Sequence, residues 1–133
     1  MVDIESQVYT KIASVLRSSF PGINVESVTT FAPASFPCAC IEEADNAAYR
    51  SSQDTGSNEN HAALMYEVNV FSNKKDKGKS ECKAIFAVID GVMERLGFTR
   101  STKFPAPYDV PMTYRLVGRY TAVASKNNVI YRR

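Results

Sequence analysis

The chain has 133 residues, of which 44% are hydrophobic and 23% are charged, and its formal net charge at pH 7 is +2. This length suits one domain with a real core, and this composition is typical of globular proteins, which excludes general disorder. Its apolar runs are far shorter than the roughly 20 residues that span a bilayer, and the start "MVDIESQVYT" lacks the basic and apolar pattern of a secretory signal. We therefore expect a single domain over residues 1–133 that is kept inside the cell and has no membrane partner.

The charges are unevenly distributed along the chain. Residues 1–46 hold six acids and two bases, whereas residues 97–133 hold seven bases and one acid. Complementary potentials steer association, so this polarity would let an acidic surface of one copy meet a basic surface of another. The alternative is that folding brings the two regions together and cancels the asymmetry.

The first expected element is an amphipathic helix over residues 3–20. Its apolar residues recur at helical steps and form one stripe: Ile4, Val8, Ile12, Val15 and Leu16. Asp3 is placed to cap the start, and Pro21 with Gly22 ends the helix.

Two strands and a long loop are expected next. The segment "NVESVTTFA" at 24–32 is rich in Val and Thr, and the strand in "FPCACIEEADN" at 36–46 is expected to start after Pro37, because proline cannot donate a ladder hydrogen bond. Residues 46–61, "NAAYRSSQDTGSNENH", are polar and without a period. They predict a loop of a length that often carries a function.

The clearest periodic signal follows this loop. In a strand over 62–71, the alternating residues expected to face the core are Leu64, Tyr66, Val68 and Val70. After "SNKKDKGKS", a helix is indicated by the spacing of Cys82, Ile85, Phe86, Ile89, Met93 and Leu96, with Ser80 or Asp76 as its cap and Gly97 as its left-handed end. The small residues Ala84, Val88 and Gly91 indicate close approach of the first helix or of a second subunit.

The last third of the chain predicts further strands. Strands are expected over 98–104 and 114–124, separated by a proline-rich link, with a short edge strand in "NVIYRR" at the end. The expected fold class is α+β, with two helices packed on a mostly antiparallel sheet in the order α-β-β-β-α-β-β and a final short strand.

The sequence shows no pattern typical of a catalytic site. It has neither a nucleophile elbow nor a phosphate-binding glycine loop, and we expect no enzymatic activity and no cofactor. An odd number of cysteines (Cys38, Cys40 and Cys82) in a chain without an export signal indicates reduced thiols that serve packing. Together with His61 they have poor spacing for a metal site, so no metal is expected.

A lysine-rich turn raises the question of nucleic acid. Its members are Lys74, Lys75, Lys77, Lys79 and Lys83. Phosphate contacts would give salt-dependent binding, but the turn has no aromatic residue on which bases could stack. Nucleic acid is not expected as a specific ligand, although a small basic nucleic-acid-binding module remains an alternative.

Most of the chain resembles a known family. The segment "YEVNVFSNKKDKGKSECKAIFAVIDGVMERLGFTR", a proline-broken link and "YRLVGRYTAV", preceded by a helix and a strand pair, are similar to the small tail terminator, or tail-to-head joining, proteins of long-tailed bacteriophages and prophages. The resemblance implies a non-enzymatic subunit of a homo-oligomeric ring, commonly a hexamer. The ring would cap the tail tube protein and offer a surface to the head connector protein, in the virion neck after assembly in the bacterial cytoplasm. Another head-tail connector or neck protein is the alternative.

The resemblance supplies no residue motif, so interface residues follow from physical arguments. A long loop with an aromatic residue and mixed charges often orders on assembly, which favours Tyr49, Arg50, Asp54 and His61 as subunit or partner contacts. Arg115 and Arg119 are second choices, because a strand face that alternates arginine with valine suits an interface. The alternative for these two is an ordinary solvent-facing role.

Overall fold

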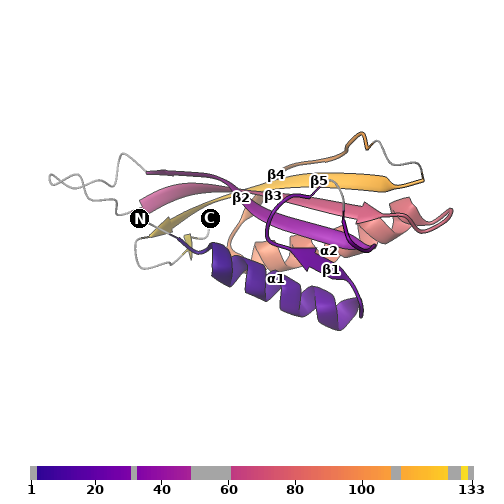
Figure 1. Cartoon of the computed structure of the whole chain (residues 1–133). Coiled ribbons are helices and arrows are strands. Elements are labelled where there is room, and N and C mark those ends of the chain that lie inside the picture. The colour runs from indigo at the N-terminus through magenta and orange to yellow at the C-terminus, as the bar shows by residue number, and fades with distance from the viewer. Residues whose placement is uncertain (1–2, 31–32, 49–60, 109–111, 126–129, 132–133) are drawn as a thin grey trace, which may run out of the picture.

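Two helices lie on one face of a six-stranded sheet in the computed structural model (Figure 1), which describes residues 3–30, 33–48, 61–108, 112–125 and 130–131. The elements are α1 (Glu5–Ser19), β1 (Asn24–Glu26), β2 (Cys38–Ala48), β3 (His61–Ser72), α2 (Gly78–Leu96), β4 (Thr99–Pro105), β5 (Tyr114–Ser125) and β6 (Ile130–Tyr131). The strand order is β1-β2-β3-β5-β4, and β6 pairs with the end of β5. Only β1 and β2 are parallel among these pairs, so the predicted α+β fold is confirmed.

The main core lies between the helices and the sheet. Leu64, Tyr66, Val68 and Val70 of β3 are all buried on the face under the helices, as their alternation predicts. The helices contribute their apolar stripes, Val8, Ile12 and Leu16 from α1 and Ile85, Phe86, Ile89 and Met93 from α2. Burial of each such side chain stabilises the fold by roughly 1.5–3 kcal/mol before the entropy cost, so both helices are held by the sheet.

A glycine sets how closely α2 approaches the sheet. Gly118 of β5 lies under Phe86, and a Cβ atom at this position would be 2.1 Å from Cζ of the Phe86 ring. The ring also stacks on Tyr120 with 6.2 Å between centroids. Any side chain at position 118 would therefore displace a buried aromatic ring.

The two ends of α2 differ in how well they were predicted. Gly97 has φ 101°, and Phe98 N–H donates to Met93 O at 2.9 Å, which is the expected left-handed C-terminal cap. The predicted start is wrong: the N-cap is Lys77, without a side-chain cap, instead of Ser80 or Asp76. The first turn is held by Glu81, whose carboxylate accepts a hydrogen bond from Ser72.

The structure does not show the first helix approaching closely at Gly91, and the second-subunit alternative for this glycine remains a prediction. Among the described residues, an added Cβ atom there would meet only the Arg95 guanidinium, at 3.5 Å, so α1 does not approach α2 closely at this glycine. Ala84 is exposed, and Val88 packs at the edge of the core. This glycine therefore does not serve contact between the two helices.

Two strand boundaries differ from the sequence expectation. The strand predicted over 24–32 ends at Glu26. After it, the Thr29 N–H donates to a side-chain atom, Glu42 Oε2 at 3.1 Å, instead of to the backbone of a neighbouring strand. β2 begins directly after Pro37 as expected, but it continues to Ala48, beyond the predicted end at 46. The polar stretch between β2 and β3 is therefore shorter than the predicted loop over 46–61, and residues 49–60 lie outside the described residues.

Candidate subunit interface

The sheet has a second face, which points away from the helices. Paired residues of an antiparallel ladder point to the same side, so the pairs Glu67–Arg119 and Met65–Thr121 lie on this face. Thr102 and Phe104 of β4 join them through their pairing with β5. We call the surface formed by Met65, Glu67, Thr102, Phe104, Arg119 and Thr121 the open face.

One end of this second face is covered by the chain itself. Phe36 and Tyr108, from the segments before β2 and after β4, pack on a small buried cluster of Cys38, Cys40 and Phe71. Beyond this cluster the open face begins, where Phe104 is 37% exposed and Arg119 is exposed. The accessible part of the face therefore lies over β3, β5 and β4.

Arg119 contacts two neighbours on the open face. Its Nε donates to Glu67 Oε1 at 3.2 Å, and its guanidinium carbon is 5.9 Å from the centroid of the Phe104 ring. The two charged side chains are 46% and 25% exposed, and an ion pair this accessible contributes little to stability. Arg119 is thus positioned by its neighbours and still accessible to a partner's carboxylate or carbonyl groups.

Arg115 is engaged within the chain. Its Nε donates to Asn69 Oδ1 at 2.9 Å, its Nη1 donates to Pro107 O at 3.4 Å, and its guanidinium carbon lies 5.8 Å from the Phe71 ring centroid. Asn69 and Phe71 are fully buried. Arg115 therefore holds the link after β4 against the sheet, and a contact with another subunit remains a prediction.

The four first-choice contact residues fall in two places. Tyr49, Arg50 and Asp54 lie outside the described residues. His61, expected in the loop, is the first residue of β3, where it pairs with Ser125. It is six residues from Glu67, about 20 Å along an extended strand, so the structure does not bring His61 together with Arg119.

Sequence reasoning missed the partners of the two arginines. Glu67 and Asn69 are separated from Arg119 and Arg115 by 52 and 46 residues along the chain, and no local pattern joins them. The alternation in β3 and β5 did place these residues on the face opposite the core. That signal was sufficient to group them once the β3–β5 pairing was known.

Opposite charges occupy opposite edges of the sheet. β1 and β2 contain Glu26, Glu42, Glu43 and Asp45 and no base, whereas β4 and β5 contain Arg100, Lys103, Arg115 and Arg119 and no acid. The strand order places β3 between the two sets. Folding therefore keeps much of the charge asymmetry of the sequence.

The acidic edge also contains a surface hollow. It has a volume of about 550 Å³ and is lined by Glu5, Glu42 and Glu43 together with Val28, which is 57% exposed. Glu43 N–H donates to Glu5 Oε2 at 3.0 Å, and burial raises the pKa of the Glu43 carboxyl group. This hollow offers carboxylates beside an exposed apolar side chain, as a basic and partly apolar partner surface would require.

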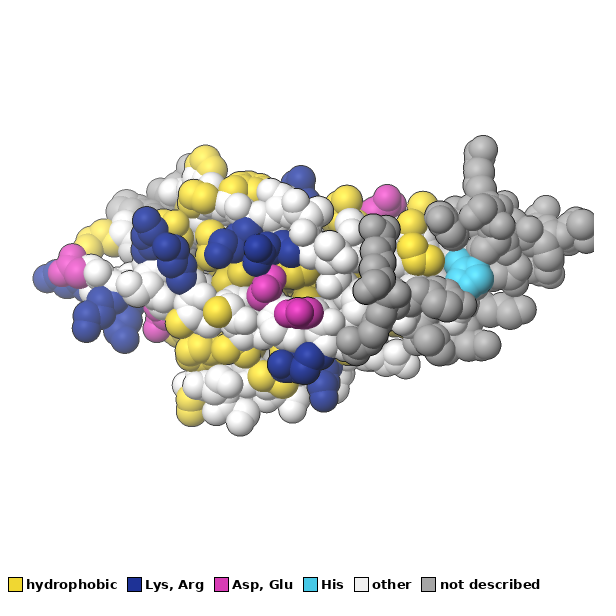
Figure 2. All heavy atoms as spheres, turned by 180° about the vertical axis from the view of Figure 1, so that it is seen from behind, with side chains coloured by type: hydrophobic (Ala, Val, Ile, Leu, Met, Phe, Trp, Pro, Cys, Tyr) yellow, Lys and Arg dark blue, Asp and Glu magenta, His cyan; other side chains and the backbone are white. Residues whose placement is uncertain are grey.

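The lysine-rich turn lies at one end of the molecule. Lys74, Lys75, Lys77 and Lys79 are exposed, and Figure 2 shows basic side chains gathered at the end opposite the histidine. Lys74, Lys75 and Lys79 line a shallow hollow of about 290 Å³ that also includes Tyr114. The structure thus brings an aromatic residue to a basic turn that has none in its own sequence.

The cysteines do not form the four-residue arrangement with His61. Cys82 lies on α2, where its buried thiol donates to Val70 O and Tyr114 O at 3.6 Å, and burial raises its pKa to about 12. Cys38 and Cys40 lie on β2 at the second face, together with Glu26. Their mutual hydrogen bond lowers the pKa of Cys40 and, together with burial, raises that of Cys38.

Within the described part of the chain, no helix is long and apolar enough to cross a membrane. A comparison of the sequence with protein-family models and with curated proteins found no match.

Proposed function

We propose that this chain is a structural subunit of a bacteriophage or prophage tail. In this proposal, copies form a ring, six in the arrangement that the resemblance implies, which caps the tail tube protein and provides the surface for head-tail joining. The chain would act by shape and contact in the virion neck, after assembly in the bacterial cytoplasm. A different head-tail connector or neck protein is the alternative within the virion.

The observation that carries the proposal is the placement of opposite charges on opposite sheet edges. Contacts between unlike patches are heterologous, and they generate a closed ring when the rotation between neighbours permits it. In this chain the acidic hollow beside Val28 lies at the β1–β2 edge, and Arg119 with Phe104 lies at the β5–β4 edge. Each patch combines charge with an exposed apolar side chain, which suits the other patch on a neighbouring copy.

The ring contact is tested by breaking one edge at a time. Arg119→Glu reverses the charge at position 119 and leaves the open face with two acids, Glu67 and the new side chain. Val28→Lys places a cation in the acidic hollow. Both replaced side chains are exposed, so the fold should persist. By native mass spectrometry each variant alone should be monomeric, whereas an equimolar mixture should give dimers, because each copy retains one intact edge. Lys83→Glu, an exposed charge reversal on α2, should leave the wild-type ring unchanged. Variants that assemble like the wild type would contradict this choice of edges.

The role in the tail needs a separate experiment. Deletion of the gene from the phage or prophage that encodes it should yield tail tubes of uncontrolled length that do not join heads, and the wild-type gene should restore both properties. Tubes of normal length that fail to join heads would favour the connector alternative. Infectious particles with normal tails would refute a role in the neck.

A second candidate function is favoured by the hollow at the lysine-rich turn. Lys74, Lys75 and Lys79 line this hollow together with Tyr114, and a positively charged surface with an aromatic side chain is a feature of single-strand binding sites. Retention on immobilised single-stranded DNA should fall steeply between low and moderate salt if phosphate contacts dominate. Tyr114→Ala should weaken the retention on single-stranded DNA at low salt relative to the wild type. If the chain does not bind nucleic acid through this hollow, the substitution should not change the retention.

A further inference from the structure

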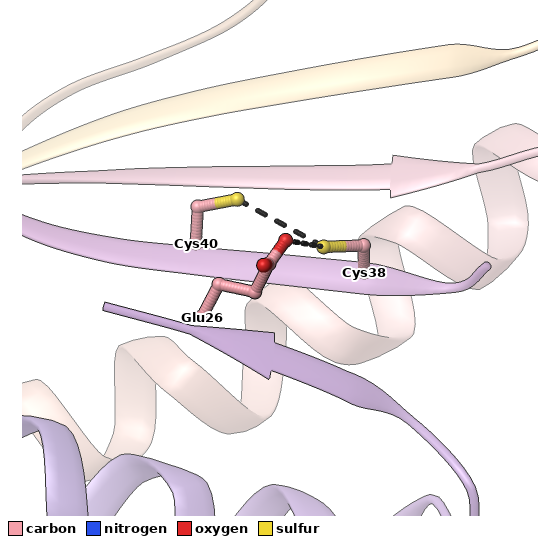
Figure 3. Close-up of side chains that lie close together, drawn as sticks. All are labelled: Glu26, Cys38 and Cys40. Carbon is pink, nitrogen blue, oxygen red and sulfur yellow. Dashed lines mark hydrogen bonds between the residues drawn. The ribbon is translucent and has the colours of Figure 1, made fainter. Parts of the chain in front are cut away.

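Three side chains with metal-binding atoms meet at the acidic edge of the sheet. Glu26 ends β1, and Cys38 and Cys40 are the first and third residues of β2. The parallel register pairs Glu26 with Cys40, and the spacing of two residues places both cysteines on one face of the strand. Figure 3 shows the carboxylate and the two thiol groups pointing toward one another.

Two of the three distances between these atoms match those around a tetrahedral zinc ion. Cys38 Sγ is 3.8 Å from Cys40 Sγ and 3.6 Å from Glu26 Oε2, and all three ligand atoms lie within 4.8 Å of one another. Zinc bonds of about 2.3 Å to sulfur and about 2.0 Å to oxygen, meeting at a tetrahedral angle, separate two sulfurs by about 3.8 Å and sulfur from oxygen by about 3.5 Å. One cation could therefore reach all three atoms with only small side-chain movements.

The surroundings suit a cation that is held between strands. Both sulfur-bearing residues are fully buried against Phe71, while Glu26 is half-buried, so the carboxylate side is the accessible one. Cys82 provides a contrast, because its thiol is also buried but donates only to backbone carbonyl groups. A packed core needs only apolar side chains, whereas this cluster brings two thiols and a carboxylate together, and each of them can bind a metal ion.

We propose that Glu26, Cys38 and Cys40 bind a thiophilic divalent cation, for which zinc has the best-fitting geometry. Thiolate ligands favour zinc over magnesium or calcium, which prefer oxygen ligands alone. Three protein ligands leave the fourth tetrahedral position to water or to a group from a partner. The ion would tie the three-residue strand β1 to β2, and this inference is independent of the proposed ring.

Cobalt(II) titration of the reduced full-length chain tests the proposal, because cobalt replaces zinc and absorbs light. We expect one cobalt per chain, with the visible bands of a tetrahedral site and a near-ultraviolet thiolate-to-cobalt band that zinc abolishes by displacement. Cys82→Ala is the matched control, and it should leave both spectrum and affinity unchanged. Cys38→Ala and Cys40→Ala should each halve the thiolate band and weaken binding by more than the roughly 10- to 100-fold typical of lost outer-shell partners.

Glu26→Gln separates the carboxylate from the thiols. This variant should keep a thiolate band from two sulfurs while cobalt affinity falls, and circular dichroism should show the wild-type fold. The wild-type spectrum decides the question even where a cysteine variant fails to fold. Absence of the thiolate band in the reduced wild type would overturn the proposal, as would a band that depends on Cys82 or a pair of thiols that only forms a disulfide.

Discussion

Replacement of Gly118 by alanine probes the contact between Phe86 of α2 and the sheet. The new Cβ atom would lie 2.1 Å from Cζ, 2.8 Å from Cε2 and 3.3 Å from Cε1 of Phe86. Carbon atoms pack favourably at about 3.5–4.0 Å, so the ring tip must move by more than 1 Å, roughly, within a core of near-crystalline density. Overpacking of this kind costs about 1–3 kcal/mol, and alanine recovers about 0.5–1 kcal/mol relative to glycine in a strand. We expect Gly118→Ala to lower the free energy of unfolding by about 1–2 kcal/mol.

Urea denaturation followed by circular dichroism measures this loss, and a double-mutant cycle assigns it to Phe86. Phe86→Leu removes the ring atoms that clash with the new Cβ atom. The free energy of unfolding that the double variant Gly118→Ala/Phe86→Leu loses should therefore be smaller than the sum of the losses of the two single variants. Gly91→Ala is the matched control, because its Cβ atom would meet only the Arg95 side chain. It should stabilise the protein by about 1 kcal/mol, since alanine is the better helix former. A Gly118→Ala variant as stable as the wild type, or additive effects in the cycle, would refute the reasoning.

Three further predictions concern side-chain partners. Arg115→Ala should lower the free energy of unfolding by about 1–3 kcal/mol, because it leaves the buried Asn69 carbonyl without this donor. Arg119→Ala should lower it by less than about 1 kcal/mol, because the ion pair with Glu67 is accessible to solvent. A larger loss for Arg119→Ala than for Arg115→Ala in urea denaturation would contradict the assigned roles. Tyr120→Phe removes a 2.9 Å hydrogen bond to a carboxylate on α2 and should lower the free energy of unfolding by about 1 kcal/mol, measured in the same way. Burial raises the pKa of Glu43 above 4.5, so its folded form binds a proton more tightly than its unfolded form, and its contribution to stability falls as pH rises through the folded pKa. Glu43→Gln should remove this decline in a series of unfolding curves from pH 4 upwards, and an unchanged pH dependence would contradict the assignment.

The elements with strong local periodicity could be predicted from the sequence. The stripe of α1, the alternation of β3 and the glycine that ends α2 all depend on neighbours a few residues apart, so the printed sequence contains the whole signal. The N-cap of α2 was predicted wrongly for a different reason. Lys77 is a poor capping residue, and the helix start is held instead by Glu81 and the buried Ser72, a contact between two elements that no capping pattern describes.

The candidate sites depended on pairings that were not visible in the sequence. β1 has only three residues, and its parallel pairing with β2 decides that Glu26 lies beside Cys38 and Cys40. A spacing of two residues places both thiols on one face of a strand, but nothing local identified the carboxylate. In the same way, β5 pairs with β3 across the α2 and β4 segments, which made Glu67 the partner of Arg119.

The strand order keeps the acidic and the basic strands of the sheet apart. If β4 or β5 were paired with β2, acids and bases would face each other across one ladder and the opposite charges would cancel. The observed order places β3 between them, and β3 contributes a single acid, Glu67, which is already paired with Arg119. Repulsion between the like charges on each edge costs little free energy in water, because solvent and salt screen it. The same charges attract a neighbouring molecule whose surface has the opposite charge. A second copy of the chain presents such an edge on its other side, so in the proposed ring the sheet order would place unlike edges against each other.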